Sequence, residues 1–288
     1  MPEGGRVTRE AMVFSSMLVV LSAGTGEPGV LAPGPQLPEA VASAESLPVS
    51  HVSPALGFDA CHVQGLAVTA DHFFFTSVNR SKREGWLFKI ARESMDVVAK
   101  RNVAIDEDFH PGGIDFDGRL LWVPVAVYSK KSHAYIVSVA PDTLECVTRF
   151  EVDDHIGAIA CAGERLIGAN WDAEAFYIWT RDGRLLERRK SPTGIAYQDC
   201  KAHGAYLVCG GGGCLDWIDV ADWRLVKRFP LGTSREGSPL SREGAALFDG
   251  EVYFLPDDGP SARIYQCRFS AAPLPSGPEP PVTAPSSP

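Results

Sequence analysis

The stretch that decides the fold reads Gly112-Gly-Ile-Asp-Phe-Asp-Gly-Arg-Leu-Leu-Trp-Val123. It has the form of two short strands joined by a tight turn at Asp117-Gly118. Glycine readily adopts the positive φ that such a turn requires. The stretch therefore predicts a β-hairpin.

The same motif recurs along the chain without gaps. Its copies begin at residues 64, 112, 157, 198 and 244, so that successive copies are 48, 45, 41 and 46 residues apart. An apolar third strand follows each copy, and a turn and a fourth strand follow the first four. A propeller blade of four short strands takes about 40–50 residues. The repeat predicts an all-β fold, a five-bladed β-propeller with four-stranded blades. The other copies are QGLAVTADHFFF (64–75), GAIACAGERLIG (157–168), QDCKAHGAYLVC (198–209) and GAALFDGEVYFL (244–255).

The fifth blade has no outer strand of its own, because the chain after it becomes rich in Pro and Ser. The apolar stretch 47–56 precedes the first blade and has the length of a strand. We expect this N-terminal strand to complete the fifth blade, which closes the ring and covers an open sheet edge.

Four segments of different composition follow one another along the chain. Arg6 and Arg9 precede an apolar run at 11–23 that is too short to span a bilayer, so residues 1–24 are predicted to be a signal peptide. Residues 25–46 are expected to be a disordered linker, 47–270 the propeller, and 271–288 a disordered Pro/Ser-rich tail. This organisation predicts a protein that is secreted or lies in the periplasm or cell envelope, with no integral membrane span.

The overall composition excludes some classes of binding partner. A net charge of −9 and a pI near 5.3 argue against a general nucleic-acid binder. Gly210–Gly213 lacks the Lys-Ser/Thr of a phosphate loop, so no nucleotide cofactor is expected. We expect a monomer that binds a small polar or anionic molecule. Seven cysteines are an odd number, and Cys200, Cys209 and Cys214 are close enough to pair among themselves.

Three histidines occupy one equivalent position in three consecutive blades. His62, His110 and His155 each stand two residues before a copy of the motif, where the first strand of a blade enters the central channel. They are candidate catalytic residues together with Glu243 and Tyr197. Neutral imidazoles also suit a divalent transition metal such as Zn, Mn, Fe or Cu, with these three histidines as ligands. The alternative is metal-free, with a histidine as general base and Arg242 holding an anion.

Other polar residues are expected at the same rim of the channel. Arg80 and Lys82 lie in a basic loop of the first blade that would attract an anion. In the fifth blade, Asp257 and Asp258 are either ligands or turn-forming residues. The candidate substrate-binding residues are Arg242, Gln64, Gln198, Arg80, Lys82, Trp171 and Asp172.

Two motifs carry a family resemblance. His62-Val-Gln-Gly-Leu66 and His110-Pro-Gly-Gly-Ile-Asp-Phe-Asp-Gly118 resemble a little-characterised family of exported bacterial five-bladed propeller proteins, over most of residues 58–270. Gln64-Gly-Leu66 followed by Thr76-Ser77 is distantly similar to the opening blade of plant-type glutamine cyclotransferases. That family has an apolar residue and a hydroxyl where this chain has His62 and Val63. The resemblance implies a five-bladed fold.

Two classes of function remain open. The first is an enzyme at the channel mouth, a hydrolase, lyase or cyclase, that uses the three histidines as a metal or acid/base centre. The alternative is a non-catalytic propeller that binds a ligand or a protein. Redox chemistry with an attached organic cofactor is less favoured, because no Cys-x-x-Cys-His motif is present.

Overall fold

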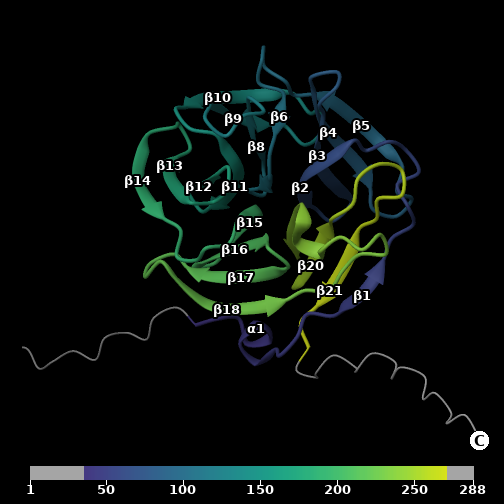
Figure 1. The fold of residues 1–288 in the computed structure, drawn as a ribbon, viewed down its shortest axis with the longest axis vertical. Coiled ribbons are helices and arrows are strands. Elements are labelled where there is room, and N and C mark those ends of the chain that lie inside the picture. Colours follow the sequence, from purple (N-terminus) through teal and green to yellow (C-terminus); the bar gives the residue numbers. More distant parts are fainter. Residues whose placement is uncertain (1–35, 271–288) are drawn as a thin grey trace, which may run out of the picture. The chain divides into compact units, whose positions relative to one another are not determined.

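Five antiparallel sheets surround a central axis in the computed structural model, which describes residues 36–270 (Figure 1). The predicted signal peptide, the first part of the predicted linker and the predicted tail lie outside these residues. In four sheets the strands follow one another outward from the axis in chain order, and in the fifth the N-terminal strand β1 is the outermost. The structure confirms the five-bladed β-propeller.

The bounds of the strands follow the repeat. Blade 1 contains β2 (His62–Val68), β3 (His72–Asn79), β4 (Glu84–Ala91) and β5 (Val97–Asn102). Blade 2 contains β6 (His110–Pro111), β7 (Asp115–Phe116), β8 (Leu121–Ala126), β9 (Ala134–Val139) and β10 (Cys146–Val152). Blade 3 contains β11 (Ile156–Ala162), β12 (Arg165–Asn170), β13 (Ala175–Thr180) and β14 (Leu185–Lys190). Blade 4 contains β15 (Tyr197–His203), β16 (Tyr206–Gly211), β17 (Cys214–Asp219) and β18 (Arg224–Pro230). Blade 5 contains β19 (Gly244–Phe248), β20 (Glu251–Leu255), β21 (Tyr265–Arg268) and β1 (Val49–Val52), and the 3₁₀ turn η1 (Leu240–Arg242) precedes it.

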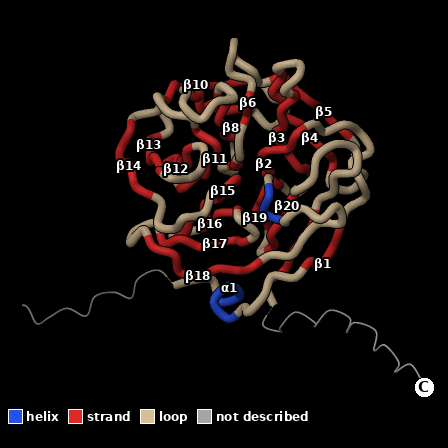
Figure 2. The backbone as a smooth tube through the Cα atoms, in the orientation of Figure 1, coloured by secondary structure: helices blue, strands red, loops and turns tan. Residues whose placement is uncertain are grey.

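The ring is closed as the sequence predicts. Strand β1 pairs antiparallel with β21, with Val52 opposite Tyr265, and so becomes the outer strand of blade 5 (Figure 1). Ordered structure also begins earlier than the predicted boundary at residue 47. The short helix α1 (Glu39–Ser43) buries Val41 against the apolar layer between blades 4 and 5 (Figure 2). None of the helices within residues 36–270 has the length and apolar character that crossing a membrane requires.

The inner hairpins turn as the motif requires. The turn glycines of blades 2 to 5 have φ of 90° at Gly118, 59° at Gly163, 58° at Gly204 and 74° at Gly250. A side chain is strained in this region of backbone space, so glycine at the seventh motif position is a conformational requirement.

The core is divided into five apolar layers, one at each junction between neighbouring blades. The junction of blades 2 and 3 holds Trp122 and Trp179, and Trp217 and Phe254 fill that of blades 4 and 5. None of these four side chains is more than 2% exposed, as expected for filler between blades, whereas Phe116 is half-buried. No blade buries both of its faces alone, so the stability of the ring depends on all five junctions.

The inner strand of blade 4 carries two buried polar side chains, Asp199 and Lys201, and burial raises the pKa of Asp199 to about 7. The carboxylate of Asp199, on the inner strand of blade 4, accepts hydrogen bonds from the backbone N–H of Leu66 (2.9 Å) and Ala245 (3.0 Å) on blades 1 and 5. Lys201 donates to the same carboxylate over 2.5 Å. Gly113 on blade 2 passes so close that a Cβ there would lie 2.5 Å from Asp199 Oδ1. These contacts fix the distances between the inner strands, and hence the width of the channel mouth.

One disulfide joins the inner hairpin of blade 4. Cys200 and Cys209 stand directly opposite each other on β15 and β16 and form this bond. Two of the three neighbouring cysteines therefore pair with each other, and Cys214 has no disulfide partner.

Candidate functional site

A cavity of about 220 Å³ opens where the inner strands begin. Its wall combines the first residues of these strands with the loops that follow the second strands of blades 2 and 3. All five candidate catalytic residues line it, as do four of the candidate substrate-binding residues, Gln64, Gln198, Trp171 and Asp172. Arg242, Arg80 and Lys82 are not among the lining residues. Tyr128, which the sequence analysis did not select, adds a further aromatic ring.

His62 and Glu243 face each other on the wall formed by blades 1 and 5. His62 Nε2 lies 4.0 Å from Glu243 Oε1. On the other side of the ring, His62 Nδ1 lies 3.1 and 3.2 Å from the two oxygens of Asp258. A carboxylate only accepts, so Nδ1 carries the proton and Nε2 is left for the cavity. The hydrogen bond to Asp258 raises the pKa of His62, against the effect of burial.

Glu243 is a buried carboxylic acid. Burial raises its pKa to about 8, although the positive charges of His62 and Arg242 oppose the shift. Arg242 pairs with both carboxyl groups, since its Nε lies 3.5 Å from Glu243 Oε1 and its Nη2 donates to Asp258 over 3.1 Å, and the pairing lowers the pKa of Glu243 by less than burial raises it. A carboxyl group that stays protonated near neutral pH can act as a general acid.

The tautomer of His110 is fixed by a chain of hydrogen bonds. Gln64 Nε2 donates to the carbonyl of Val63 over 2.8 Å, so Gln64 Oε1 must be the atom that faces His110 Nε2, also at 2.8 Å. His110 Nε2 therefore carries the proton, and Nδ1 is an acceptor with no hydrogen-bond partner in the described part of the chain. Burial lowers the pKa of His110 to about 3, with smaller contributions from the neighbouring side chains of His155, His62 and Arg80.

His155 is neutral for a similar reason. Burial lowers its pKa to about 4, against hydrogen bonds to the backbone. Its Nδ1 lies 3.0 Å from the carbonyl oxygen of Ser129 and donates to it, so Nε2 is unprotonated. The imidazole ring of His155 stands edge-on to the ring of Trp171, with centroids 4.5 Å apart. The ring centroids of His155 and His110 are 5.3 Å apart. On the same wall of the cavity, the ring centroids of Tyr128 and His110 are 4.2 Å apart.

The three histidines do not form a compact ligand set. Gln64 occupies Nε2 of His110, and Asp258 occupies Nδ1 of His62. Within residues 36–270, no group of three or more His, Cys, Asp and Glu side chains is placed to hold a metal ion. The metal therefore stays a prediction.

Several other candidates are held by contacts of their own. The hydroxyl of Tyr197 donates to Asp216 over 2.5 Å, so only its ring faces the cavity. At the rim, Lys130 is paired with Asp172 and with Glu174. Arg80 stacks over the ring of Tyr128 at 4.3 Å.

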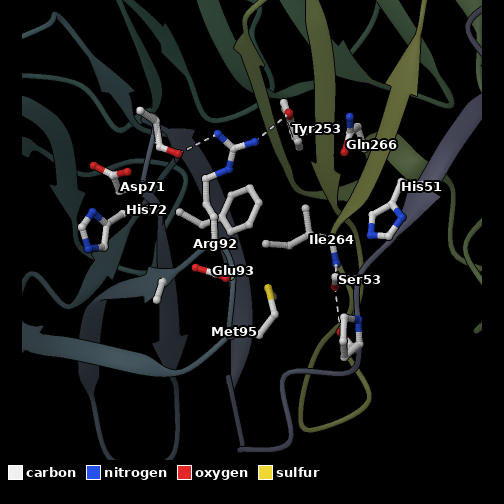
Figure 3. Close-up of a pocket in the computed structure, with 14 residues that line it drawn as sticks. His51, Ser53, Asp71, His72, Arg92, Glu93, Met95, Tyr253, Ile264 and Gln266 are labelled. Carbon is white, nitrogen blue, oxygen red and sulfur yellow. Dashed lines mark hydrogen bonds between the residues drawn. The ribbon is translucent and has the colours of Figure 1, made fainter.

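A larger pocket of about 680 Å³ lies between blades 1 and 5, away from the channel mouth (Figure 3). Arg92 crosses it and donates to the carbonyls of Thr69 (2.9 Å) and Ala70 (3.1 Å) and to the hydroxyl of Tyr253 (3.0 Å). Its guanidinium also lies 5.0 Å from the ring of Phe248. Three of the five N–H donors of Arg92 are used in these hydrogen bonds, so this side chain connects blades 1 and 5.

The fold and the site together define a class: a five-bladed propeller in which a histidine and a buried glutamate face each other in a cavity at the start of the inner strands. The chain belongs to the family of unknown function DUF6454, whose model matches residues 49–267. No curated protein matches its sequence significantly.

Solved structures share the fold. The glutaminyl cyclase of Myxococcus xanthus superimposes with a TM-score of 0.60 at 14% identity, over 78% of this chain and 96% of that one. BamB of Moraxella catarrhalis gives a TM-score of 0.40 at 12% identity, over 71% of this chain and 59% of that one. The expected distant similarity to the glutamine cyclotransferase fold is confirmed at the level of architecture.

Proposed function

We propose that the protein is an enzyme that performs general acid/base catalysis on a small polar substrate at the channel mouth. Glu243 is the acid, His62 is the base, and Asp258 positions His62. The observation that carries the proposal is the facing pair itself: a buried carboxyl group with a pKa of about 8, 4.0 Å from an imidazole nitrogen. Perturbed acid and base groups that share a cavity are typical of active sites.

The pair can move one proton in each direction. His62 Nε2 removes a proton from the attacking group, and Glu243 gives its proton to the leaving group. The cycle ends with an imidazolium and a carboxylate 4.0 Å apart, and transfer of the proton between them restores both groups. Hydrolysis, elimination and cyclisation all need this pair of transfers.

Cyclisation of an N-terminal glutaminyl residue is the first reaction to test, because a glutaminyl cyclase shares the fold. In that reaction the α-amine attacks the side-chain amide carbon, a C–N bond forms, and the original C–N bond breaks to release ammonia. One proton leaves the attacking nitrogen and one reaches the departing nitrogen, which matches the roles of His62 and Glu243. Chromogenic esters and glycosides cover the hydrolytic alternatives.

The decisive experiment compares His62→Asn and Glu243→Gln with the unaltered protein on these substrates. Loss of one proton-transfer group costs about 10²–10⁴-fold in rate. His133→Phe is the matched control, because His133 lies outside the cavity. Infrared difference spectra of the protein against Glu243→Gln should show a protonated carboxyl group at pH 7. An ionised Glu243 at pH 7, or full activity in both variants, would refute acid/base catalysis and favour the binding propeller.

A metal is the second candidate, favoured by one observation. Each of the three histidines has one ring nitrogen engaged by an oxygen, from Asp258, Gln64 or Ser129. A metal-binding histidine commonly donates a hydrogen bond from its second ring nitrogen to an oxygen of the protein. Elemental analysis after incubation with Zn, Mn, Fe and Cu salts, beside a variant with all three histidines changed to alanine, decides between the two. One equivalent of metal that the variant lacks would establish the metal site.

Export is part of the proposal. It is supported by Arg6 and Arg9 before an apolar run, in a segment outside the described residues. N-terminal sequencing of the protein from a bacterial host should find a mature end near residue 24. A cytoplasmic protein that keeps its first residues would overturn export.

A further inference from the structure

The wall of the cavity formed by blades 2 and 3 presents hydrogen-bond acceptors. His110 and His155 each use one nitrogen to donate to a fixed oxygen, at 2.8 Å and 3.0 Å. Their second nitrogens, Nδ1 and Nε2, are therefore lone-pair acceptors. Nδ1 of His110 is buried without a partner in the described part of the chain. A buried acceptor without a partner is costly, so a bound donor would stabilise this wall.

The charges around the cavity argue against an ionic ligand. No Lys or Arg is among the residues that line it. An anionic group such as a carboxylate offers no donor to the two imidazoles, and their depressed pKa values prevent them from becoming donors to it. A cation would meet the positive charge of Arg80, which lowers the pKa of His110, and the carboxylate of Asp172 in the cavity wall is already paired with Lys130. A neutral ligand with its own N–H or O–H groups fits both conditions.

The volume of the cavity and the aromatic rings in its wall restrict the class of ligand further. A volume of about 220 Å³ corresponds to roughly seven water molecules at about 30 Å³ each. That is below the ~300–1,000 Å³ of pockets for drug-sized ligands, so a single ring is the largest suitable group. Trp171 and Tyr128 stand nearly perpendicular to each other at 5.8 Å and line the same wall. An aromatic surface beside fixed acceptors suits a ring with one apolar face and hydroxyl groups at its edge.

We propose that the cavity binds a neutral sugar ring, a single pyranose unit, whose hydroxyl groups donate to His110 Nδ1 and His155 Nε2 and whose apolar face contacts Trp171. This rests on the proposed function, because it names the substrate class of the same site. The pyranose then stands with its opposite edge toward His62 and Glu243, where proton transfer would occur.

The first test measures binding by the full-length protein with ligand-observed NMR and calorimetry. The probes are neutral methyl pyranosides of glucose, galactose, mannose and fucose. Three controls lack one required property each: glucuronate is an anion, glucosamine is a cation, and a fully O-methylated glucoside has no donors. We expect at least one neutral pyranoside to bind at least tenfold more tightly than its three controls. Equal or tighter binding of the charged sugars, or no binding of any neutral pyranoside at millimolar concentration, would overturn the proposal.

The second test assigns the hydrogen bond to the histidine. His155→Phe keeps a ring of similar shape and removes the acceptor, and His133→Phe is the control outside the cavity. Loss of one hydrogen bond should weaken binding about tenfold. A deoxy sugar that lacks the donated hydroxyl should bind the unaltered protein more weakly than the parent sugar by the same factor. The His155→Phe variant should bind the two sugars equally. If His155→Phe and the removal of the sugar hydroxyl weaken binding independently of each other, a direct hydrogen bond between the two groups is refuted. Thermal melting identifies a variant that fails to fold.

The two proposals fail differently. Pyranoside binding with an ionised Glu243 would remove the proposed catalysis and leave a sugar-binding propeller. Catalysis by His62 and Glu243 on peptides, without pyranoside binding, would remove the sugar and leave the enzyme.

Discussion

At the residue scale, Glu243 connects the site to the stability of the fold. Its pKa rises from an ordinary 4.5 to about 8 because the folded protein buries it. Between these two values the folded state holds a proton that the unfolded state has lost, so the free energy of unfolding falls as pH rises. The slope for one group is roughly 1.4 kcal/mol per pH unit. The decrease in the free energy of unfolding ends at pH values above the pKa of Glu243 in the folded protein, about 8.

We therefore expect Glu243→Gln to remove this slope, because the amide does not titrate. Urea unfolding at pH 5 and pH 8.5 should show the variant gaining stability relative to the unaltered protein as pH rises. The control is Glu145→Gln, an exposed side chain. Parallel pH profiles for the two proteins would show that Glu243 is ionised in the folded state.

Asp258 should control the acidic limb of the pH–rate profile. Catalysis requires unprotonated His62 and protonated Glu243, so kcat/KM rises through the first pKa and falls through the second, at about 8. The hydrogen bond to Asp258 raises the pKa of His62. Asp258→Asn should therefore move the acidic limb to lower pH, and should move the alkaline limb in the same direction by less, because the charge of Asp258 is only a minor cause of the raised pKa of Glu243. A profile that keeps its shape at a lower rate would mean that Asp258 only supports the fold.

The residue scale is also where prediction from sequence reached its limit. Equivalent positions correctly placed His62, His110 and His155 on one cavity. Their directions were not predictable, because inner strands β2, β11 and β15 each carry a register shift at their start. Such bulges re-aim side chains without a sequence signature of their own. Tyr128 was missed because it lies in a loop outside the repeated motif.

At the scale of the elements, Asp199 should be among the most sensitive positions of the fold. Its carboxylate joins the inner strands of blades 1 and 5 to that of blade 4 and pairs with buried Lys201. Removing one partner of a buried ion pair typically costs about 3–5 kcal/mol. We expect Asp199→Ala to lose at least this much in urea unfolding. Asp142→Ala, at a side chain that is 96% exposed, should change stability by about 0.5 kcal/mol or less. A mild effect of Asp199→Ala would show that the packing of the five junctions suffices without this link.

The strands themselves were predictable because each one repeats a local rule. Short apolar runs and a turn glycine at the seventh motif position are properties of short segments, and four such glycines have the required φ. The contacts of Asp199 were not predictable, because they join residues 133 and 46 positions apart in the sequence. Burial of α1 was missed for the same reason, since Val41 finds its apolar partners only in the closed ring.

At the scale of the whole molecule, closure depends on a strand borrowed from the other end of the chain. Strand β1 covers β21, which would otherwise present unpaired N–H and C=O groups and the apolar residues Tyr265 and Cys267. Exposed edges of this kind pair with other chains. Loss of β1 should therefore reduce both the stability and the solubility of the ring.

The corresponding experiment compares a chain that begins at residue 37 with one that begins at residue 57. The first keeps α1 and β1, and the second lacks both. We expect the longer chain to melt cooperatively as a monomer. The shorter chain should melt at a lower temperature and self-associate in light scattering, and a synthetic peptide of residues 47–56 should reverse both effects by occupying the edge of β21. Identical melting and a monomeric shorter chain would mean that four complete blades and a three-stranded fifth hold the ring without the N-terminal strand.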